Sequence, residues 1–563
     1  MIKQTKVKIP ASNSKSFTDS VLDNRNMPKH ELFGNMSCVE PPQNMLGVIV
    51  GGAVAMEHME RKHKIGFSID YDYDGMSCGV VAALSMRKLG YTNFYLANNT
   101  RSMGFGLNRQ TVDMMLKEHP DTKLIITADN GIVAFDAVDY ANSLGIDVII
   151  TDHHLPDETG RLPNAKAIID PHQAGETCSF KDLCGTGVLY KFMSYIFYLL
   201  GRDPRELYDV LDHVAAATVA DVVPLRGENR WIFAEGIEVM NRGGKPLWEA
   251  FKKENASMSI FKGNNDQDKY NNDFTSKTIG YFIGPCINAC SRMSGDIKEP
   301  LDVFLNTSDE NMQEAVHHLV KVNEIRKTIQ KCRCNEAMYL TKDCDDRFLV
   351  IDMPACEEGI VGLVAGRLCN SYYRPTIVLS KDEHGNWKGS GRSIVGVHIK
   401  EMLDIVNKKH PDVLIAYGGH SQACGLTVRD GKVDVLRKAL NDYCNENFAE
   451  ELFNEVITVD YVMSSPSEIP RLYAEQLAME PFGCEFPEPV VMTTFKPNAV
   501  FPLKNGTHLK FLYRGMELLC WNCGHHLNGK DPAKIVEVTV VGNLDSNSTM
   551  NCNPELLQLK FAD

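Results

Sequence analysis

The chain has 563 residues, of which 44% are hydrophobic and 23% are charged, a composition that excludes collagen-like, coiled-coil and wholly disordered proteins. At about 150 residues per domain, this length predicts three or four packed domains. The formal net charge of −14 excludes a protein that coats itself with nucleic acid through a basic surface. Any polyanion must therefore be bound in a local groove or through metal ions.

The 17 cysteines are not spaced as in a compact disulfide scaffold, and residues 1–15 lack the apolar core of a signal peptide. The longest apolar run, from Met45 to Met56, is about half the roughly 20 residues that a membrane helix requires. We therefore expect reduced cysteines, no contact with a membrane and a cytoplasmic protein, or one of the host cytoplasm if the source is viral.

Residues 1–44 are polar and rich in Ser and Asn, which predicts an N-terminal arm. From Lys64 onward, short apolar runs alternate with helical stretches, which is typical of a mostly parallel sheet covered on both faces. An Asn-rich insert over 262–273 predicts a loop. A long helix is expected to begin at Thr307, because Thr307 and Glu310 fit a capping box.

A second strand-helix alternation follows that helix, and the last part of the chain is rich in short strands separated by polar turns. The predicted class is therefore α/β with a C-terminal β domain. The predicted organisation is an arm over 1–44, a parallel-sheet domain over 45–300, a connecting helix over 301–345, a second α/β domain over 346–445 and a small β-barrel over 446–563.

The first predicted strand, residues 65–69, delivers Asp70, Asp72 and Asp74 before a glycine. Three carboxylates in five residues repel one another unless cations bind between them. An EF-hand calcium loop begins in the same way, but it requires Glu at its twelfth position, where this chain has Val81. The pattern thus favours a cation site at the end of a strand over a calcium loop.

Two later predicted strands also end in functional groups. One leads to Asp129, and the next leads to Asp152, His153 and His154. In an open α/β sheet, functional groups gather at the carboxyl ends of the strands, so these side chains are expected to converge with the first acidic cluster. Asp221, at the end of an apolar helical stretch, is by itself a weaker signal.

Nine motifs, in this order, resemble the DHH phosphoesterase superfamily and, within it, the RecJ-type single-strand-specific exonucleases. The resemblance covers about residues 65–563, nearly the whole chain. The motifs are DYDYDG (70–75), TADNGI (127–132), TDHH (151–154), VADVVPL (219–225), IGPCINACSRM (283–293), GIVGLVAGRL (359–368), GSGRS (389–393), GGHSQACG (418–425) and EPFGCEFPEP (480–489).

The resemblance implies hydrolysis of a phosphodiester with two divalent cations, Mn²⁺ as the preferred ion and Mg²⁺ as a substitute. It implies that Asp129 bridges the two ions, that His154 faces the phosphate and that Asp152 orients an imidazole. The implied metal ligands are Asp70, Asp72, Asp74, Asp129, His153 and Asp221. The implied catalytic set is Asp72, Asp74, Asp129, His153, His154 and Asp221.

The second α/β domain resembles the companion domain of this superfamily, named DHHA1, and offers a phosphate clamp. Its implied substrate-binding residues are Ser390, Arg392, Gly418, Gly419 and His420, and Arg292 of the first domain joins them as a contact for the phosphate next to the scissile bond. One departure stands out, because Glu357 and Glu358 precede Gly359 where the family usually has His. Substrate binding at that position is left open.

The C-terminal segment resembles the oligonucleotide-binding (OB) barrel of RecJ-type enzymes. Lys504, Lys510, Arg514 and Phe511 would combine backbone charge with base stacking, or they are ordinary solvated strand residues. Cys520 and Cys523, followed by His525 and His526, resemble half of a zinc site. Because two further ligands with a clear spacing are missing, the pattern favours ordinary strand and turn residues.

The leading hypothesis is a metal-dependent 5′→3′ exonuclease that degrades single-stranded DNA to 5′-mononucleotides in recombination, repair or replication. One alternative is a DHH phosphodiesterase for short oligoribonucleotides or cyclic dinucleotides, a class that typically lacks the terminal barrel. Another is an inactive DHH replication scaffold, which the retained metal ligands disfavour. The implied partners are single-stranded DNA and a single-strand-binding protein or a helicase, with the enzyme itself a monomer.

Overall fold

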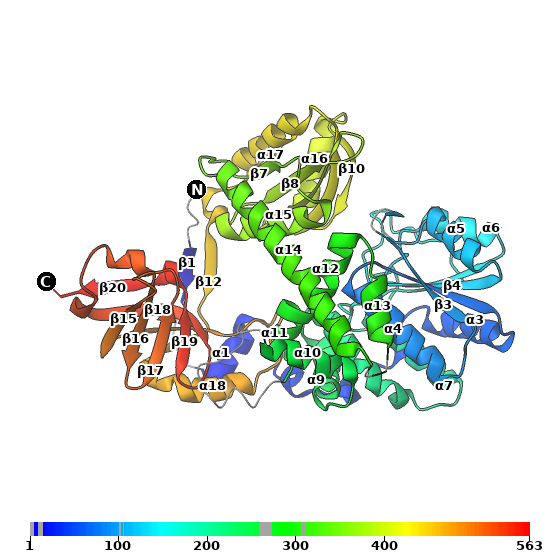
Figure 1. Cartoon of the computed structure of the whole chain (residues 1–563), viewed down its shortest axis with the longest axis horizontal. Coiled ribbons are helices and arrows are strands. Elements are labelled where there is room, and N and C mark those ends of the chain that lie inside the picture. Colours follow the sequence, from blue (N-terminus) through cyan, green and yellow to red (C-terminus); the bar gives the residue numbers. More distant parts are fainter. Residues whose placement is uncertain are drawn as a thin grey trace. The chain divides into compact units, whose positions relative to one another are not determined.

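A computed structural model describes residues 5–9, 15–100, 103–104, 106–257, 273–306, 308 and 310–562. Most of the Asn-rich insert, and Thr307 of the predicted capping box, lie outside the described residues. The chain divides into two compact units. One comprises Lys29–Arg326 and Pro481–Pro487, and the other comprises Met1–Pro28, Lys327–Glu480 and Glu488–Asp563. Figure 1 shows the chain coloured by sequence, with many of its elements labelled.

The unit that begins at Lys29 is built on a five-stranded parallel sheet with the order β3-β2-β4-β5-β6. Chain order along the sheet reverses between β2 and β4. Ligands bind at the carboxyl ends of strands beside such a switch point. The strands are β2 (Lys64–Ile69), β3 (Phe94–Asn98), β4 (Thr122–Ala128), β5 (Asp147–Thr151) and β6 (Ala167–Ile169).

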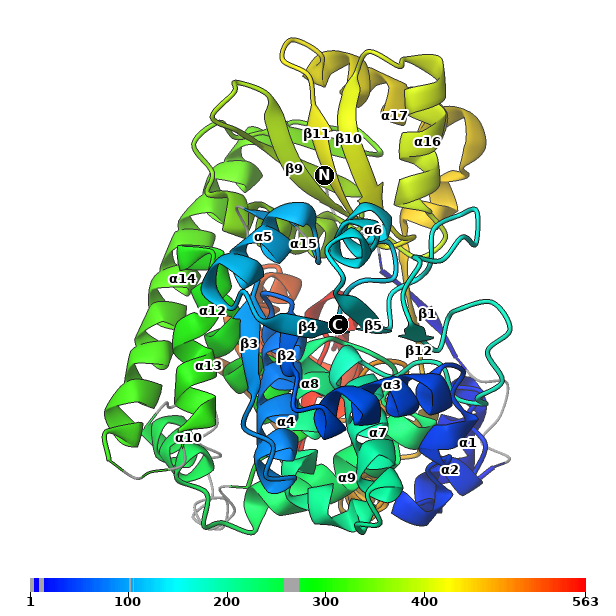
Figure 2. The same ribbon diagram turned by 90° about the vertical axis from the view of Figure 1, so that its right-hand side faces the viewer.

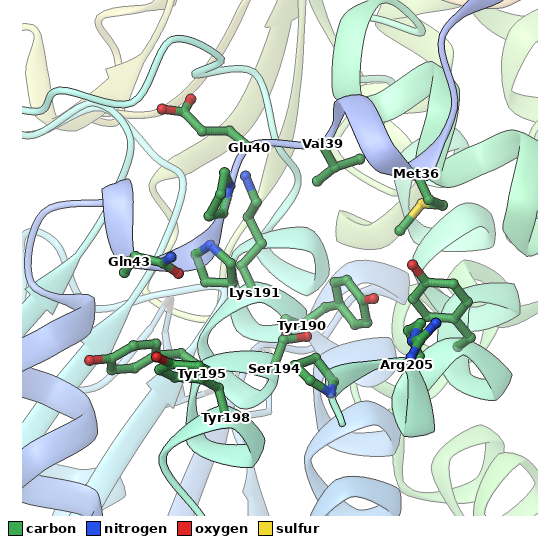
Figure 3. Close-up of a pocket in the computed structure, with 14 residues that line it drawn as sticks. Met36, Val39, Glu40, Gln43, Tyr190, Lys191, Ser194, Tyr195, Tyr198 and Arg205 are labelled. Carbon is green, nitrogen blue, oxygen red and sulfur yellow. The ribbon is translucent and has the colours of Figure 1, made fainter. Parts of the chain in front are cut away.

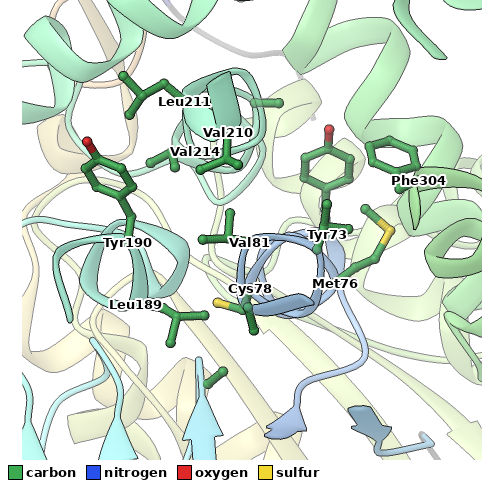
Figure 4. Close-up of a cluster of buried hydrophobic side chains, with 14 of the residues drawn as sticks. Tyr73, Met76, Cys78, Val81, Leu189, Tyr190, Val210, Leu211, Val214 and Phe304 are labelled. Atoms are coloured by element: carbon green, nitrogen blue, oxygen red, sulfur yellow. The ribbon is translucent and has the colours of Figure 1, made fainter. Parts of the chain in front are cut away.

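Helices cover both faces of this sheet (Figure 2). Because side chains alternate along a strand, Ile125 and Val148 pack against α5 and α6, whereas Ile126 and Ile149 pack into the larger core that contains α3, α4 and α7. Figure 4 shows part of that core, where Cys78 and Leu189 belong to neighbouring helices. The helices are α3 (Val48–Glu60), α4 (Tyr73–Lys88), α5 (Arg109–Glu118), α6 (Phe135–Ser143) and α7 (Gly185–Leu199).

A helical layer completes this unit. Trp248 and Phe304 are buried there in edge-to-face contact, with ring centroids 5.8 Å apart. The helices are α2 (His30–Phe33), α8 (Leu211–Ala220), α9 (Gly227–Asn241), α10 (Pro246–Ser257), α11 (Ser276–Thr278), α12 (Gly284–Ser294) and α13 (Lys298–Leu305). The predicted connecting helix is α14 (Met312–Leu340), which continues across the boundary between the two units.

The other unit contains a mixed five-stranded sheet with the order β10-β11-β9-β8-β7. Only β7 and β8 are parallel neighbours, and the other pairs are antiparallel. The strands are β7 (Leu349–Asp352), β8 (Thr376–Lys381), β9 (Trp387–Arg392), β10 (Leu414–Gly419) and β11 (Ala423–Val428). Its helices are α15 (Glu358–Tyr372), α16 (Ile399–Lys409) and α17 (Val433–Asn447).

The C-terminal strands form an eight-stranded sheet with the order β13-β14-β18-β19-β17-β16-β15, and β20 pairs with β18. A small barrel was predicted here, but the described strands do not close into one, because β13 and β15 end this order and do not pair with each other. The strands are β13 (Tyr461–Met463), β14 (Val490–Phe495), β15 (Ala499–Leu503), β16 (His508–Tyr513), β17 (Met516–Cys520), β18 (Ile535–Leu544), β19 (Thr549–Cys552) and β20 (Gln558–Phe561).

The N-terminal residues contain short elements that pack against this C-terminal region. Strand β1 (Thr5–Lys8) pairs in parallel with β12 (Glu455–Thr458). Helix α1 (Phe17–Asn24) lies beside α18 (Ile469–Leu477), and Phe17 at its start is fully buried. Among the described residues, no helix combines the length and the apolar character needed to span a membrane.

Candidate metal centre and phosphate site

Four aspartates stand in a row at the carboxyl edge of the parallel sheet. Asp70, Asp129, Asp152 and Asp170 directly follow β2, β4, β5 and β6, and the last residues of these neighbouring strands are paired in register. The four residues therefore occupy equivalent positions on strands about 4.8 Å apart. The row spans the switch point between β2 and β4. The sequence patterns predicted the first three positions but missed Asp170, because β6 is only three residues long.

His153 is the meeting point of the acidic groups. Its Nε2 lies 3.1 Å from Asp129 Oδ1, 3.7 Å from Asp221 Oδ2 and 3.9 Å from Asp74 Oδ2. The residues fall into three overlapping groups, within each of which one ligand atom per residue lies within 4.8 Å of the others. The groups are Asp129, His153 and His154; Asp74, His153 and Asp221; and Asp70, Asp72 and Asp129. The structure thus brings together all six residues proposed as metal ligands.

The electrostatics of this cluster fit divalent cations. Burial, and then repulsion by neighbouring carboxylates, raises the pKa values of Asp70, Asp72, Asp129 and Asp221. The buried Oδ1 atom of Asp70 has no hydrogen-bond partner among the described residues. A buried group of this kind is costly unless cations bind to it. Carboxylate oxygens with one imidazole nitrogen are a donor set suited to Mn²⁺ or Mg²⁺.

Asp74 is held by the first turn of α7. Its carboxylate accepts hydrogen bonds from the backbone N of Gly185 at 2.7 Å and of Thr186 at 2.9 Å, and from Thr186 Oγ1 at 2.6 Å. A Cβ at Gly185 would stand 2.6 Å from the Asp129 side chain, so only glycine permits this approach. Sequence reasoning missed both residues, although a Gly-Thr-Gly segment at the start of an apolar helix was a usable signal.

The two histidines after β5 have opposite protonation tendencies. Asp152 Oδ1 accepts hydrogen bonds from the backbone N of His153 at 2.8 Å and lies 2.8 Å from His154 Nδ1. Burial alone would lower the pKa of His154, but the hydrogen bond and charge of Asp152 raise it to about 10. Burial and the charge of His154 lower the pKa of His153. A neutral His153 suits a metal, and a cationic His154 suits a phosphate.

Helix α12 carries Arg292 on the face that contacts the acidic segment. Asn288 Oδ1 accepts a hydrogen bond of 2.9 Å from the backbone N of Tyr73, which lies between Asp72 and Asp74. Arg292 follows Asn288 by four residues, and residues at this spacing share one face of a helix. The partly buried Arg292 is therefore on the side of α12 that faces the start of α4.

The residues predicted to clamp a phosphate in the second α/β domain are assembled on one sheet. Gly425 of β11 pairs with Ser390 of β9 on one side and with Gly418 of β10 on the other. Arg392 Nη1 donates to Ser390 Oγ at 2.9 Å. A Cβ at Gly418 would meet only open space, so a ligand can approach the backbone there.

The backbone turn at the end of β10 requires a second glycine, Gly419. Gly419 has φ +141°, and a Cβ there would stand 2.3 Å from the carbonyl oxygen of Ala423. The backbone N of the next residue, His420, donates to that same oxygen at 2.8 Å. This tight turn presents the exposed His420 at the end of the strand that carries Gly418. The predicted residues therefore lie at the same end of one sheet, on β10 and β9, with β11 between them.

The two acidic residues at the family's usual histidine position are engaged in ion pairs. Glu357, directly before α15, receives two hydrogen bonds of 2.9 Å from Arg333 of α14, and the Arg333 hydrogen bonds lower the pKa of this carboxyl. Glu358 lies 2.6 Å from Lys388 Nζ of β9. Both carboxylates are therefore paired with basic side chains in the structure.

The proposal that Phe511 of the C-terminal sheet stacks against bases was wrong. Phe511 is 0% exposed and packs inside the sheet, because side chains on β16 alternate between its two faces. The exposed aromatic residues of this region are Phe501 (44%) and Trp521 (43%). Phe501 pairs directly with Lys510 across β15 and β16, and the ammonium lies 5.8 Å from the ring centroid. An aromatic and a cation thus share one face of the sheet.

The cysteines of the C-terminal domain behave as ordinary buried residues. Cys520 ends β17 and Cys523 lies in the turn that follows, with both side chains buried. Within the described ranges, neither belongs to a group of His, Cys, Asp or Glu with metal-binding spacing. Cys523 Sγ instead donates to the carbonyl oxygen of Cys520 at 3.0 Å.

A separate pocket of about 180 Å³ lies beside α7 (Figure 3). Tyrosines and prolines make up half of its lining residues, and none of the residues predicted to bind metal or phosphate lines it. Lys191 points into this region, but its Nζ donates to the buried Glu228 at 2.5 Å. The ammonium of Lys191 is therefore already paired with a carboxylate.

Comparison with known proteins agrees with this architecture. Three family models match: the N-terminal domain of the DHH family over residues 64–218, the DHHA1 domain over 345–446 and the RecJ OB domain over 459–561. The single-stranded-DNA-specific exonuclease RecJ of Haemophilus influenzae is 30% identical over 90% of this chain and 88% of its own length.

Solved structures of RecJ from Thermus thermophilus show the same fold. The complex with Mn²⁺ has a TM-score of 0.79 and 21% identity, covering 99% of this chain and 80% of that one. The complex with Mg²⁺ has a TM-score of 0.75 and 20% identity, covering 99% and 79%. From the three consecutive domain matches and the extent of the similarity to H. influenzae RecJ, we conclude that this chain belongs to the RecJ family of DHH exonucleases.

Proposed function

We propose that this protein is an exonuclease that hydrolyses single-stranded DNA to 5′-mononucleotides from the 5′ end, using two divalent cations. The observation that carries the proposal is the convergence of Asp70, Asp129 and His153 at the switch point of the parallel sheet. The names of the relatives support single-stranded DNA as the substrate. The matched OB domain disfavours the alternative of a phosphodiesterase for cyclic dinucleotides or short oligoribonucleotides, a class that typically lacks it.

The proposed ligands are Asp70, Asp72, Asp74, Asp129, His153 and Asp221, with Asp129, a member of two of the three groups, as the bridging carboxylate. Bound Mn²⁺ or Mg²⁺ would supply an activated water and screen the charge of the phosphate. His154, a cation held in place by Asp152, contacts the scissile phosphate. Arg292 contacts the neighbouring phosphate. These residues position the substrate and neutralise its charge as the leaving oxygen departs.

We propose that Ser390, Arg392, Gly418, Gly419 and His420 bind the 5′-terminal phosphate and thereby set the direction of digestion. A guanidinium, a hydroxyl and exposed glycine amides are a recurrent set of donors for a phosphate. On the C-terminal sheet, Phe501 and Lys510 provide stacking and backbone charge for the strand. This division assigns chemistry to the parallel-sheet domain and end recognition to the second α/β domain.

The proposal is tested with purified protein and an end-labelled single-stranded oligonucleotide. After treatment with EDTA we expect no hydrolysis, and added Mn²⁺ should restore the release of 5′-mononucleotides. The same preparation is offered a dinucleotide of RNA and a cyclic dinucleotide as competitors. Faster hydrolysis of either competitor than of the oligodeoxynucleotide would favour the alternative phosphodiesterase.

The proposed phosphate clamp can be tested separately from the metal centre. Arg392→Ala and His420→Ala should raise KM for a 5′-phosphorylated strand by about tenfold, because each variant loses a charge-assisted contact to phosphate. Their affinity for Mn²⁺, measured by calorimetry, should stay within about twofold of wild type, since neither residue is a proposed ligand. The charge-reversing Arg392→Glu is the stronger variant. Loss of Mn²⁺ binding in either alanine variant would contradict the division of roles.

A further inference from the structure

The turn after β6 repeats the turn after β5 on the neighbouring strand. In the first turn, Asp152 Oδ1 accepts a hydrogen bond of 3.2 Å from the backbone N of His154, two residues later. In the second, Asp170 Oδ1 accepts a hydrogen bond of 2.7 Å from the backbone N of His172, again two residues later. Both turns therefore follow an Asp-x-His pattern, with the carboxylate folded back onto its own loop.

The two turns are also equivalent in space. The strands β5 and β6 are parallel and in register up to the residue before each aspartate, so His172 lies one strand beyond His154 along the same edge. The two imidazole side chains are exposed to similar extents, 33% for His154 and 24% for His172.

Several contacts fix the second turn. The backbone N of Gln173 donates to the carbonyl oxygen of Asp170 at 3.2 Å. The side-chain amide of Gln173 donates to the carbonyl oxygens of Ile168 at 3.0 Å and Leu46 at 3.2 Å. Residue 171 between them is a proline, which restricts the backbone further. His172 is therefore presented on a preorganised loop.

This fixed loop leaves polar atoms unpaired. Asp170 is 0% exposed, yet its Oδ2 has no hydrogen-bond partner among the residues that the structure describes, and neither has His172 Nδ1. The Nδ1 atom lies 3.8 Å from Asp170 Oδ1, beyond hydrogen-bond distance. An unpaired buried polar group is costly, so these two atoms at the acidic edge lack a partner that the described residues do not supply.

We propose that His172 is a further substrate-contacting residue that binds the backbone phosphate next to the one held by His154, with Asp170 as its positioning residue. The inference rests on the proposed function, since it requires a nucleic-acid strand at this edge. A strand that passes His154 along the carboxyl ends of β5 and β6 meets His172 next. Asp170 fixes the loop through the backbone N of His172, and an imidazole on such a loop is a suitable donor to a phosphate oxygen.

The first test separates binding from chemistry. With Mn²⁺ and a 5′-phosphorylated single-stranded oligonucleotide, His172→Ala should raise KM about fivefold and leave kcat within about twofold of wild type. His172→Gln, which keeps a side-chain donor, should recover part of the loss, and Asp170→Asn should raise KM less than His172→Ala does. His318→Ala is the matched control, because His318 is an exposed histidine of the same unit that pairs with Glu299 at 3.2 Å. It should behave as wild type.

The second test does not depend on hydrolysis. In EDTA, fluorescence anisotropy should show that His172→Ala binds the same oligonucleotide about fivefold more weakly, with a smaller dependence on salt because one phosphate contact is lost. Wild-type affinity in His172→Ala would overturn the inference, as would loss of Mn²⁺ binding by calorimetry. If His172→Ala unfolds at a lower temperature than wild type, His172→Gln is compared with wild type instead. If the wild-type protein binds the oligonucleotide but does not cleave it, the proposed function is refuted. The comparison of binding between wild type and His172→Ala would still test the inference.

Discussion

Replacing Asp129 by Ala should lower kcat on single-stranded DNA by about 10³-fold or more, because the proposed bridging carboxylate supports both cations that stabilise the transition state. Asp129 lies 3.1 Å from His153 and belongs to two of the three ligand groups, so its loss removes a ligand atom from both groups. The fold should survive, since removing one carboxylate relieves repulsion inside the cluster. Single-turnover kinetics with Mn²⁺ and circular dichroism measure the two effects.

A graded control strengthens this test. Thr186→Val keeps the size of the side chain but removes the hydroxyl that donates to Asp74, so it should weaken Mn²⁺ binding by about tenfold while preserving a measurable rate. Thr186→Ser should retain the hydrogen bond and most of the affinity. Activity of Asp129→Ala within tenfold of wild type would refute the two-metal assignment, whatever the result for Thr186.

The acidic edge of the sheet was predictable because its signals are local. Asp70 and Asp129 each end an apolar strand, and the rule that parallel strands share a carboxyl edge places them together without knowledge of the sheet order. The resemblance to the DHH superfamily then supplied the roles. The register that aligns Asp170 with them was not predictable, because a strand of three residues gives no periodic signal.

Other features depend on contacts between distant parts of the chain. Thr186 reaches Asp74 across 112 positions of sequence, and no local pattern marks that pairing. Phe511 and Phe501 both lie in strand-like segments, and only the register of β15 with β16 shows that Phe511 faces inward and Phe501 outward. The open edges of the C-terminal sheet were unpredictable for the same reason. Strand composition predicts strands, but it does not show whether the first and last strands of the sheet pair with each other.

Single-stranded DNA should be degraded at least about 100-fold faster than a blunt duplex of the same sequence. The proposed ligands are recessed, since Asp70, Asp74 and Asp129 are almost wholly buried, and a phosphate must come into direct contact with ions bound among them. A stiff duplex keeps its phosphates on a wide, paired framework, whereas a single strand can bend inward and stack its bases on exposed aromatic residues. Equal rates on both substrates would overturn this explanation.

If the proposed clamp binds the terminal phosphate, it would fix which end reaches the proposed metal centre, and digestion should then begin at the 5′ end. A strand with a 5′-phosphate should be cleaved faster than the same strand with a 5′-hydroxyl, and this difference should disappear in Arg392→Ala, which lacks the guanidinium bonded to Ser390. The products of 5′- and 3′-labelled strands, resolved over time, report the direction. Digestion from the 3′ end of a 5′-blocked strand would contradict the proposed role of the clamp. It would not contradict the proposed metal ligands.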